Sequence, residues 1–161
     1  MDSVRTIDGI DTGILMLLEE SPRETVLGLA RRLALARNTV QAHLDRLERR
    51  GLLSRTSNRA LLEAIGHPIL AFTTVEAAQG RLREVVAGLA ELPEVLDAHA
   101  TLGEGDLVCR VAARSAEHLY DVVDKILHIP GVERTRSSLA ARELLPLRID
   151  PLLQEWAHGR R

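Results

Sequence analysis

The sequence has few aromatic residues, one cysteine and no long apolar run. Phe72, Tyr120 and Trp156 are the only aromatics among 161 residues, which leaves little for the base-stacking platforms of single-strand binders. The lone Cys109 excludes a disulfide framework and a CxxC metal clip. No segment approaches the roughly 18 apolar residues of a membrane span, and the N-terminus lacks the pattern of a secretory signal. We therefore expect a cytoplasmic protein without a membrane segment.

Charge is distributed unevenly along a chain whose formal net charge is −2. Residues 31–59 contain eight arginines against Asp45 and Glu48, a local balance of +6. Residues 60–161 contain 11 basic and 15 acidic groups, a balance of −4. This asymmetry indicates that the N-terminal part meets an anion.

Apolar periodicity predicts three helices in the first third of the chain, over residues 8–20, 24–34 and 37–50. The short connection at Leu35 and Ala36 between the last two is typical of a helix-turn-helix. In the third helix Val40, Leu44 and Leu47 form the buried stripe. The alternative, a three-helix bundle that binds protein, stays open.

Polar side chains on the other side of the third helix have the chemistry of base recognition. Asn and Gln can pair with adenine, Arg with guanine, and a small Ala admits a thymine methyl. Arginines at its end and in the following wing, a strand over residues 52–55 and an arm to Arg59, are expected to meet phosphates. The predicted DNA-binding residues are Arg37, Asn38, Thr39, Gln41, Ala42, Arg46, Arg49, Arg50 and Arg55.

From His67 onward the pattern becomes β-α-β-β-α-β, with strands near 69–75, 95–101, 107–112 and 132–142. This order predicts an α+β, ferredoxin-like domain: a four-stranded antiparallel sheet with both helices on one face. A second copy of the sheet is the simplest cover for the other face, which implies a homodimer. We expect a DNA-binding domain at 1–53, a connecting segment at 54–66, a sensing and assembly domain at 67–147 and a tail at 148–161.

Several motifs resemble those of the Lrp/AsnC family of feast-famine regulators over about residues 8–147. They are Ile7–Asp11 with Ile14–Leu15, Leu29–Leu35, Val40–Glu48, Gly51–Leu53, Gly103–Leu107 and Leu127–Arg136. The resemblance implies transcription regulation through double-stranded DNA, dimers that can stack into tetramers or octamers, and an amino-acid effector bound between dimers. It places the effector at the turn Leu102, Gly103, Glu104, Gly105 and Asp106, where the two glycine amides would meet a carboxylate and an acidic side chain an ammonium group.

The sequence departs from the family pattern at two positions. Gly105 stands where many relatives have a large residue, and Ala36 stands where a serine commonly caps the recognition helix.

Three other functional hypotheses are considered beside this one. The C-terminal domain could serve assembly alone, without an effector. Haem-biosynthesis decarboxylases that act on tetrapyrroles share the two-domain architecture, but they do not need the basic, polar-faced third helix. The six histidines show no HxxxH or HxH spacing, so we expect no metal site. We expect no cofactor and no enzymatic activity.

Overall fold

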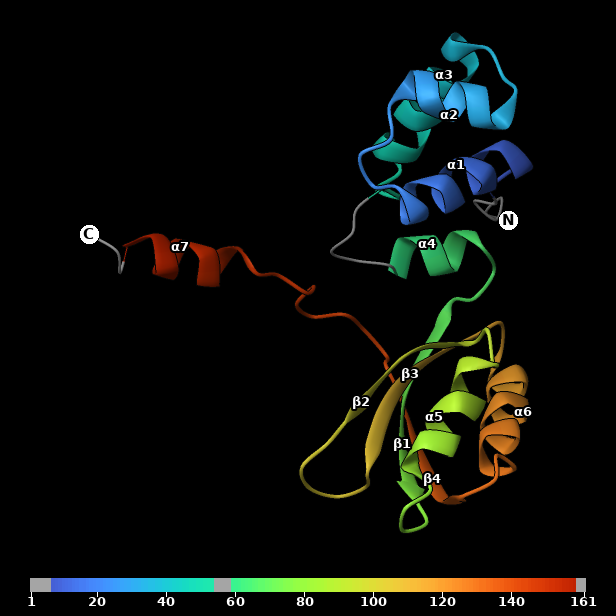
Figure 1. Ribbon diagram of the computed structural model, residues 1–161, viewed down its shortest axis with the longest axis vertical. Helices are drawn as coiled ribbons and strands as arrows, with labels where there is room; N and C mark the ends of the chain where they lie inside the picture. Colours follow the sequence, from blue (N-terminus) through green and yellow to red (C-terminus); the bar gives the residue numbers. More distant parts are fainter. Residues whose placement is uncertain (1–6, 54–58, 159–161) are drawn as a thin grey trace. The chain divides into compact units, whose positions relative to one another are not determined.

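The computed structural model describes residues 7–53 and 59–158. Contacts divide the chain into two compact units. The first unit comprises Met1–Ile65 with Leu144–Arg161, and the second comprises Gly66–Glu143. Figure 1 shows the helices and strands within each unit. Among the described residues no helix has the length and apolar character needed to cross a membrane.

Three helices form the core of the first unit, as the periodicity predicts: α1 (Gly9–Glu20), α2 (Val26–Leu33) and α3 (Arg37–Arg49). Asp8 caps α1 through a capping box with Asp11, and Thr25 caps α2 by accepting from the Gly28 N–H. The buried side chains that hold the helices together are Ile14, Leu29, Ala30, Val40, Leu47, Leu52 and Ala64.

The segment after α3 differs from the expected strand and wing. Leu52 and Leu53 lie in a turn, and residues 54–58, with Arg55, lie outside the described residues. The predicted connecting segment contains a helix, α4 (Arg59–Ala64). Its sequence is rich in Ala and Leu, which favour helix, and Ala64 joins the core of the first unit with Leu61 packed against it.

The second unit is the predicted α+β domain. Its sheet has the order β2-β3-β1-β4, with every neighbouring pair antiparallel, and both helices cover one face (Figure 1). The elements are β1 (Ile69–Ala77), α5 (Leu82–Ala90), β2 (Val95–Ala100), β3 (Leu107–Ala113), α6 (Ala116–Leu127) and β4 (Val132–Leu139). The last strand ends earlier than predicted, at Leu139.

The two faces of the sheet have different surroundings. Alternate residues such as Val75 and Val111 are fully buried against α5 and α6. Cys109 lies among them as a small core residue, and burial raises the pKa of its thiol to about 11. The open face exposes 46% of Phe72 and carries a cross-strand ion pair between Asp97 and Arg110.

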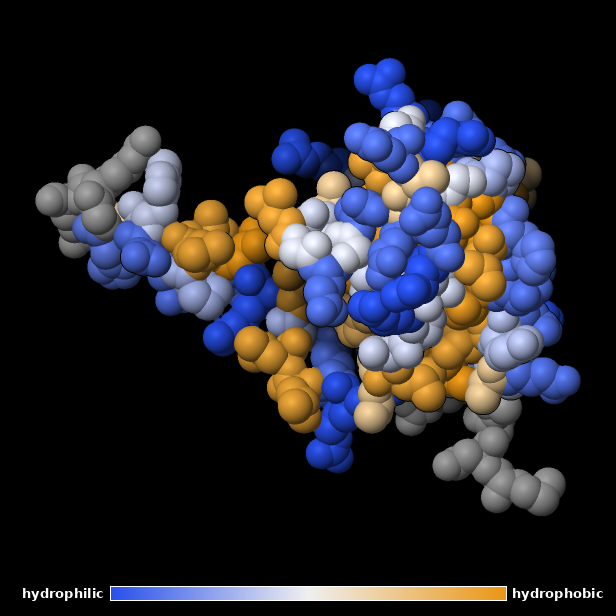
Figure 2. All heavy atoms as spheres, turned by 90° about the horizontal axis from the view of Figure 1, so that it is seen from below, coloured by the Kyte–Doolittle hydropathy of each residue, from blue (hydrophilic) through white to orange (hydrophobic). Residues whose placement is uncertain are grey.

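The expected tail contains a further helix, α7 (Asp150–His158). Ile149, Leu152, Leu153 and Trp156 recur at helical spacing and are all exposed. In Figure 2, hydrophobic residues lie at the surface of the segment on the left. The helix is therefore amphipathic, with its apolar side open to solvent.

Ala34 offers a test of the turn between α2 and α3. It is the one described residue other than glycine with a positive φ, 53°, and its side chain is exposed. Because a Cβ disfavours this conformation, Ala34→Gly should raise the unfolding free energy by about 1 kcal/mol, measured by urea denaturation followed through the helical circular dichroism. Ala42→Gly, at an exposed position in the interior of α3, should lower it by about 1 kcal/mol. Equal losses in both variants would contradict this account of the turn.

Candidate DNA-binding surface

The helix-turn-helix is built from α2, a tight turn and α3. The Leu35 N–H donates to the carbonyl of Ala30 at 2.9 Å, which closes the turn. Ala36 stands at the N-cap of α3 with no side-chain hydrogen bond to the helix, so the serine cap common in the family is missing here. Val40 and Leu47 are buried, which directs the opposite side of α3 outward.

Most predicted DNA-binding residues lie on this outward side of α3. Arg37, Asn38, Gln41, Ala42 and Arg49 are exposed. Thr39, Arg46 and Arg50 are half-buried. The exposed residues form a strip of polar and small side chains that base edges can meet, with arginines at both ends of the helix.

One acidic side chain interrupts this strip. The Gln41 side-chain amide donates to Asp45 Oδ1 at 2.7 Å on the exposed surface of α3. Because exposed pairs of this kind contribute little to stability, DNA can displace the contact at small cost. Asp45 can itself accept from the amino group of cytosine.

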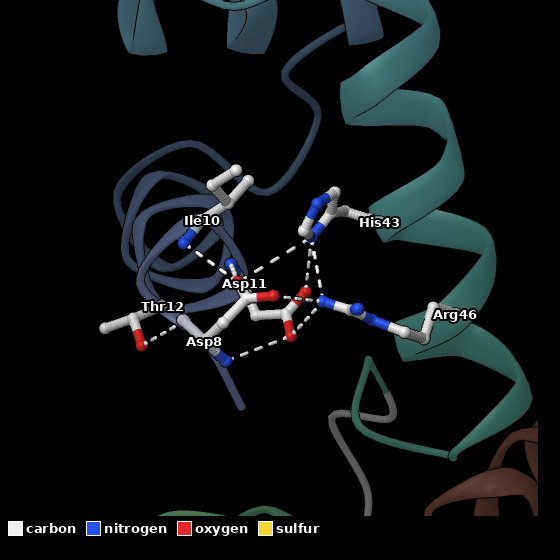
Figure 3. A network of polar contacts seen from close by, with 6 residues as sticks. All are labelled: Asp8, Ile10, Asp11, Thr12, His43 and Arg46. Atoms are coloured by element: carbon white, nitrogen blue, oxygen red, sulfur yellow. Dashed lines mark hydrogen bonds and ion pairs between the residues drawn. The ribbon is translucent and has the colours of Figure 1, made fainter. Parts of the chain in front are cut away.

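A network of charged residues joins α1 to α3 (Figure 3). We call Asp8, Asp11, His43 and Arg46 the α1–α3 network. One terminal nitrogen of the Arg46 guanidinium lies 2.6 Å from Oδ2 of Asp8 and 2.6 Å from Oδ2 of Asp11. The Asp11 side chain is only 1% exposed, so its charge is tolerated because these partners surround it.

His43 is the fourth member of the network. Its Nδ1 lies 2.8 Å from Oδ1 of Asp11 and 2.9 Å from a terminal nitrogen of Arg46. A ring nitrogen donates to the carboxylate when it carries a proton and accepts from the guanidinium when it does not. The tautomer of His43 therefore decides which of the two contacts is a hydrogen bond.

The network lowers the pKa of both carboxyl groups. For Asp8 the hydrogen bond from the Asp11 backbone N–H contributes most. For Asp11, burial alone would raise the pKa, but hydrogen bonds from Arg46 and His43 outweigh it and hold the pKa below its ordinary 3.8. Asp8, Asp11 and His43 could together ligate a cation, but the Arg46 guanidinium already supplies the positive charge at that position.

The predicted effector turn is a compact loop between β2 and β3. Leu102, Gly103, Glu104 and Asp106 are exposed, and Gly105 is half-buried. The Asp106 carboxylate accepts from the Ala77 N–H at 2.7 Å, so this group is engaged in holding the loop to β1. Glu104 is 93% exposed, with Oε2 at 3.4 Å from the guanidinium of Arg136 on β4.

Gly105 is required by this loop conformation. Its φ is +79°, and a Cβ there would lie 2.3 Å from Cγ2 of Thr74. A large side chain at this position therefore needs a different loop, which gives a physical reason for the departure from the family pattern.

Comparison with known proteins identifies the family. Residues 70–148 match the model of the Lrp/AsnC ligand binding domain, and residues 7–53 match that of a winged helix-turn-helix DNA-binding domain. A regulator from Pyrococcus abyssi, described as an uncharacterized HTH-type transcriptional regulator, is 31% identical over 134 residues, which is 83% of this chain and 85% of that one. The chain belongs to the Lrp/AsnC family. It is a DNA-binding transcriptional regulator.

Solved structures of transcription regulators agree with this assignment. The leucine response regulatory protein of Mycobacterium tuberculosis is 30% identical with a TM-score of 0.52, covering 89% of this chain and 98% of that one. A transcriptional regulator of Neisseria meningitidis, solved in complex with L-methionine, is 26% identical with a TM-score of 0.53, covering 91% and 99%. The expected absence of enzymatic activity stays a prediction.

The α1–α3 network of this Lrp/AsnC protein was not predicted from its sequence. The sequence pattern predicted instead that Arg46 reads a base. The available signal was spacing: Asp8 and Asp11 are three residues apart, as are His43 and Arg46, so each pair lies on one side of its helix. Arg136 was also missed, because only the sheet register brings β4 beside Thr74 and the Glu104 loop.

Acid should weaken the first unit of this regulator through Asp8 and Asp11. A carboxyl group whose pKa is lowered on folding contributes stability above its unfolded pKa, about 4, and loses it as the pH falls through the folded value. Asp11→Asn should lower the melting temperature at pH 7 by about 5 °C or more and flatten its decline below pH 4. Glu19→Gln, at an exposed position of α1, is the matched control and should leave the profile unchanged. A variant Asp11→Asn with the wild-type acid profile would contradict the assignment.

Proposed function

We propose that this regulator reads DNA sequence with the outward side of α3 and that arginines around it fix the protein on the phosphate backbone. The observation that carries the proposal is the exposed strip of Arg37, Asn38, Gln41 and Ala42 on a helix whose opposite side is buried. Such a strip supplies hydrogen-bond donors, acceptors and a small apolar contact within one major groove. Arg49 then lies further along α3, where backbone phosphates flank the groove.

The proposed DNA-binding form contains a second copy of the chain, which supplies a second α3 helix. The open face of the sheet exposes Phe72 beside half-buried Leu70 and Val108, whereas α5 and α6 cover the other face. We infer that the open faces of two copies pack together and hold two α3 helices for successive major grooves. A homodimer of this kind predicts a partly palindromic operator.

We propose that the effector binds at the loop before β3. Exposed Glu104 and Arg136 offer one negative and one positive group 3.4 Å apart. An amino acid carries both complementary charges, so its ammonium can meet Glu104 and its carboxylate Arg136 or the amide of Gly103. The relative solved with L-methionine and the ligand-binding family of this domain support an amino-acid effector.

DNA binding is tested by fluorescence anisotropy at fixed salt, because salt sets the non-specific background. The wild-type protein should bind DNA from upstream of its own gene at least about tenfold more tightly than a scrambled duplex. Asn38→Ala and Gln41→Ala should reduce that preference, each by about 1–3 kcal/mol at the base pair concerned. Arg49→Ala should weaken binding to both duplexes alike and lower the salt slope by about 1.

Arg83→Ala, an exposed arginine of α5 in the second unit, is the matched control for Arg49→Ala and should bind as the wild type does. Loss of preference in Arg49→Ala, with preference intact in Asn38→Ala and Gln41→Ala, would contradict the reading surface.

Effector binding is tested by adding each common amino acid to the protein–DNA complex. One or more should raise the melting temperature and change the DNA affinity severalfold. Glu104→Gln and Arg136→Gln should abolish the response while leaving DNA binding without effector intact, and Glu133→Gln on β4 is the control. If no amino acid has an effect, the C-terminal domain serves assembly alone.

A further inference from the structure

Arg46 has two possible partners, DNA and the carboxylates of α1. In the structure its partners are the carboxylates. The Arg46 guanidinium donates hydrogen bonds to Asp8 and Asp11, and His43 lies beside it on the same side of α3 (Figure 3). Asn38 and Gln41 are exposed, whereas Arg46 is half-buried against α1. The side chain that reaches α1 therefore differs from those that face outward.

The carboxylates of Asp8 and Asp11 would lose different amounts of stabilisation if Arg46 moved away. Asp8 is about half-exposed and can be solvated by water. Asp11 is almost fully buried, and withdrawal of the guanidinium would leave its charge with far less compensation. A base or phosphate that recruited Arg46 would therefore have to offset a buried carboxylate, which disfavours the exchange.

We propose that Arg46 is a positioning residue, which holds the C-terminal half of α3 to Asp8 and Asp11 of α1 and thereby sets how the N-terminal half meets DNA, without contacting a base. This inference rests on the proposed reading function of α3. It replaces the base contact that the sequence pattern suggested for Arg46. His43 and Asp11 complete the arrangement, since His43 contacts the second oxygen of the same buried carboxylate.

The geometry explains why a positioning contact is needed here. α3 has no side-chain N-cap, so its N-terminal end has no such bond to fix it. The buried residues Val40 and Leu47 make non-directional apolar contacts, which tolerate small rotations of the helix. A charge-assisted hydrogen bond to two carboxylates is directional, and it defines the rotation of α3 about its own axis.

The test compares Arg46→Met, Asp11→Asn and the double variant on the operator and on duplexes with each base pair changed singly. Each single variant should weaken binding to every duplex by the same factor, tenfold or more, with base preferences unchanged. The double variant should bind no more weakly than the weaker single one, because both changes break one contact. Glu19→Gln controls for loss of an α1 carboxylate and should bind normally.

Opposite behaviour of the two single variants would overturn the inference. If Arg46 reads a base, Arg46→Met loses discrimination at one base pair, whereas Asp11→Asn releases the guanidinium and keeps or increases affinity. The melting temperature of each variant shows whether it is folded. If Arg46→Met fails to fold, Arg46→Lys takes its place: a folded lysine variant with unchanged base preferences supports positioning, and a changed preference at one base pair contradicts it.

The wild-type protein separates this inference from the proposed function. A wild type that binds all duplexes equally overturns sequence reading itself. A wild type that discriminates, with loss of one base preference in the Arg46 variant alone, overturns only the positioning role.

Discussion

A buried carboxylate with a charged partner on another helix determines much of the first unit. Asp11 takes part in the capping box that starts α1, and it accepts from Arg46 and contacts His43 on α3. A carboxylate with so little access to water is stable only while these partners remain. The start of α1 and the middle of α3 are therefore held at one crossing, and the apolar cluster around Ile14 and Val40 fills the space between the helices.

The second unit is organised by the contrast between its two sheet faces. α5 and α6 supply an apolar cover to one face, so residues such as Val75 and Val111 lose all contact with water. The open face combines exposed Phe72 with the Asp97–Arg110 ion pair, which lowers the pKa of Asp97 because Arg110 donates to it. A face that is partly apolar and partly charged suits a specific interface, since apolar area gives affinity and charges select the partner.

Much of this architecture could be predicted from local pattern. Apolar residues in α1 to α3 follow an i, i+3, i+4 spacing, and Leu107, Cys109 and Val111 alternate in β3. In each case these residues face a single packed surface, so the spacing in the sequence predicts the element. The α1–α3 network could not be predicted in the same way, because Asp11 and Arg46 are 35 residues apart and no local rule links them. The helix α4 has only six residues, too few for periodicity to distinguish it from a connecting strand. The glycine at position 105 was visible, but the reason for it, Thr74 on β1, depends on the sheet register.

In the proposed dimer two copies of α3 read one operator together. This pairing is tested by selecting bound DNA from a randomised library with the wild-type protein. We expect enriched sequences with two related half-sites whose centres are about 10 base pairs apart, or a multiple of one helical turn. Enrichment of a single half-site without a partner would contradict reading by two α3 helices. No enrichment above the starting library would contradict sequence reading by α3.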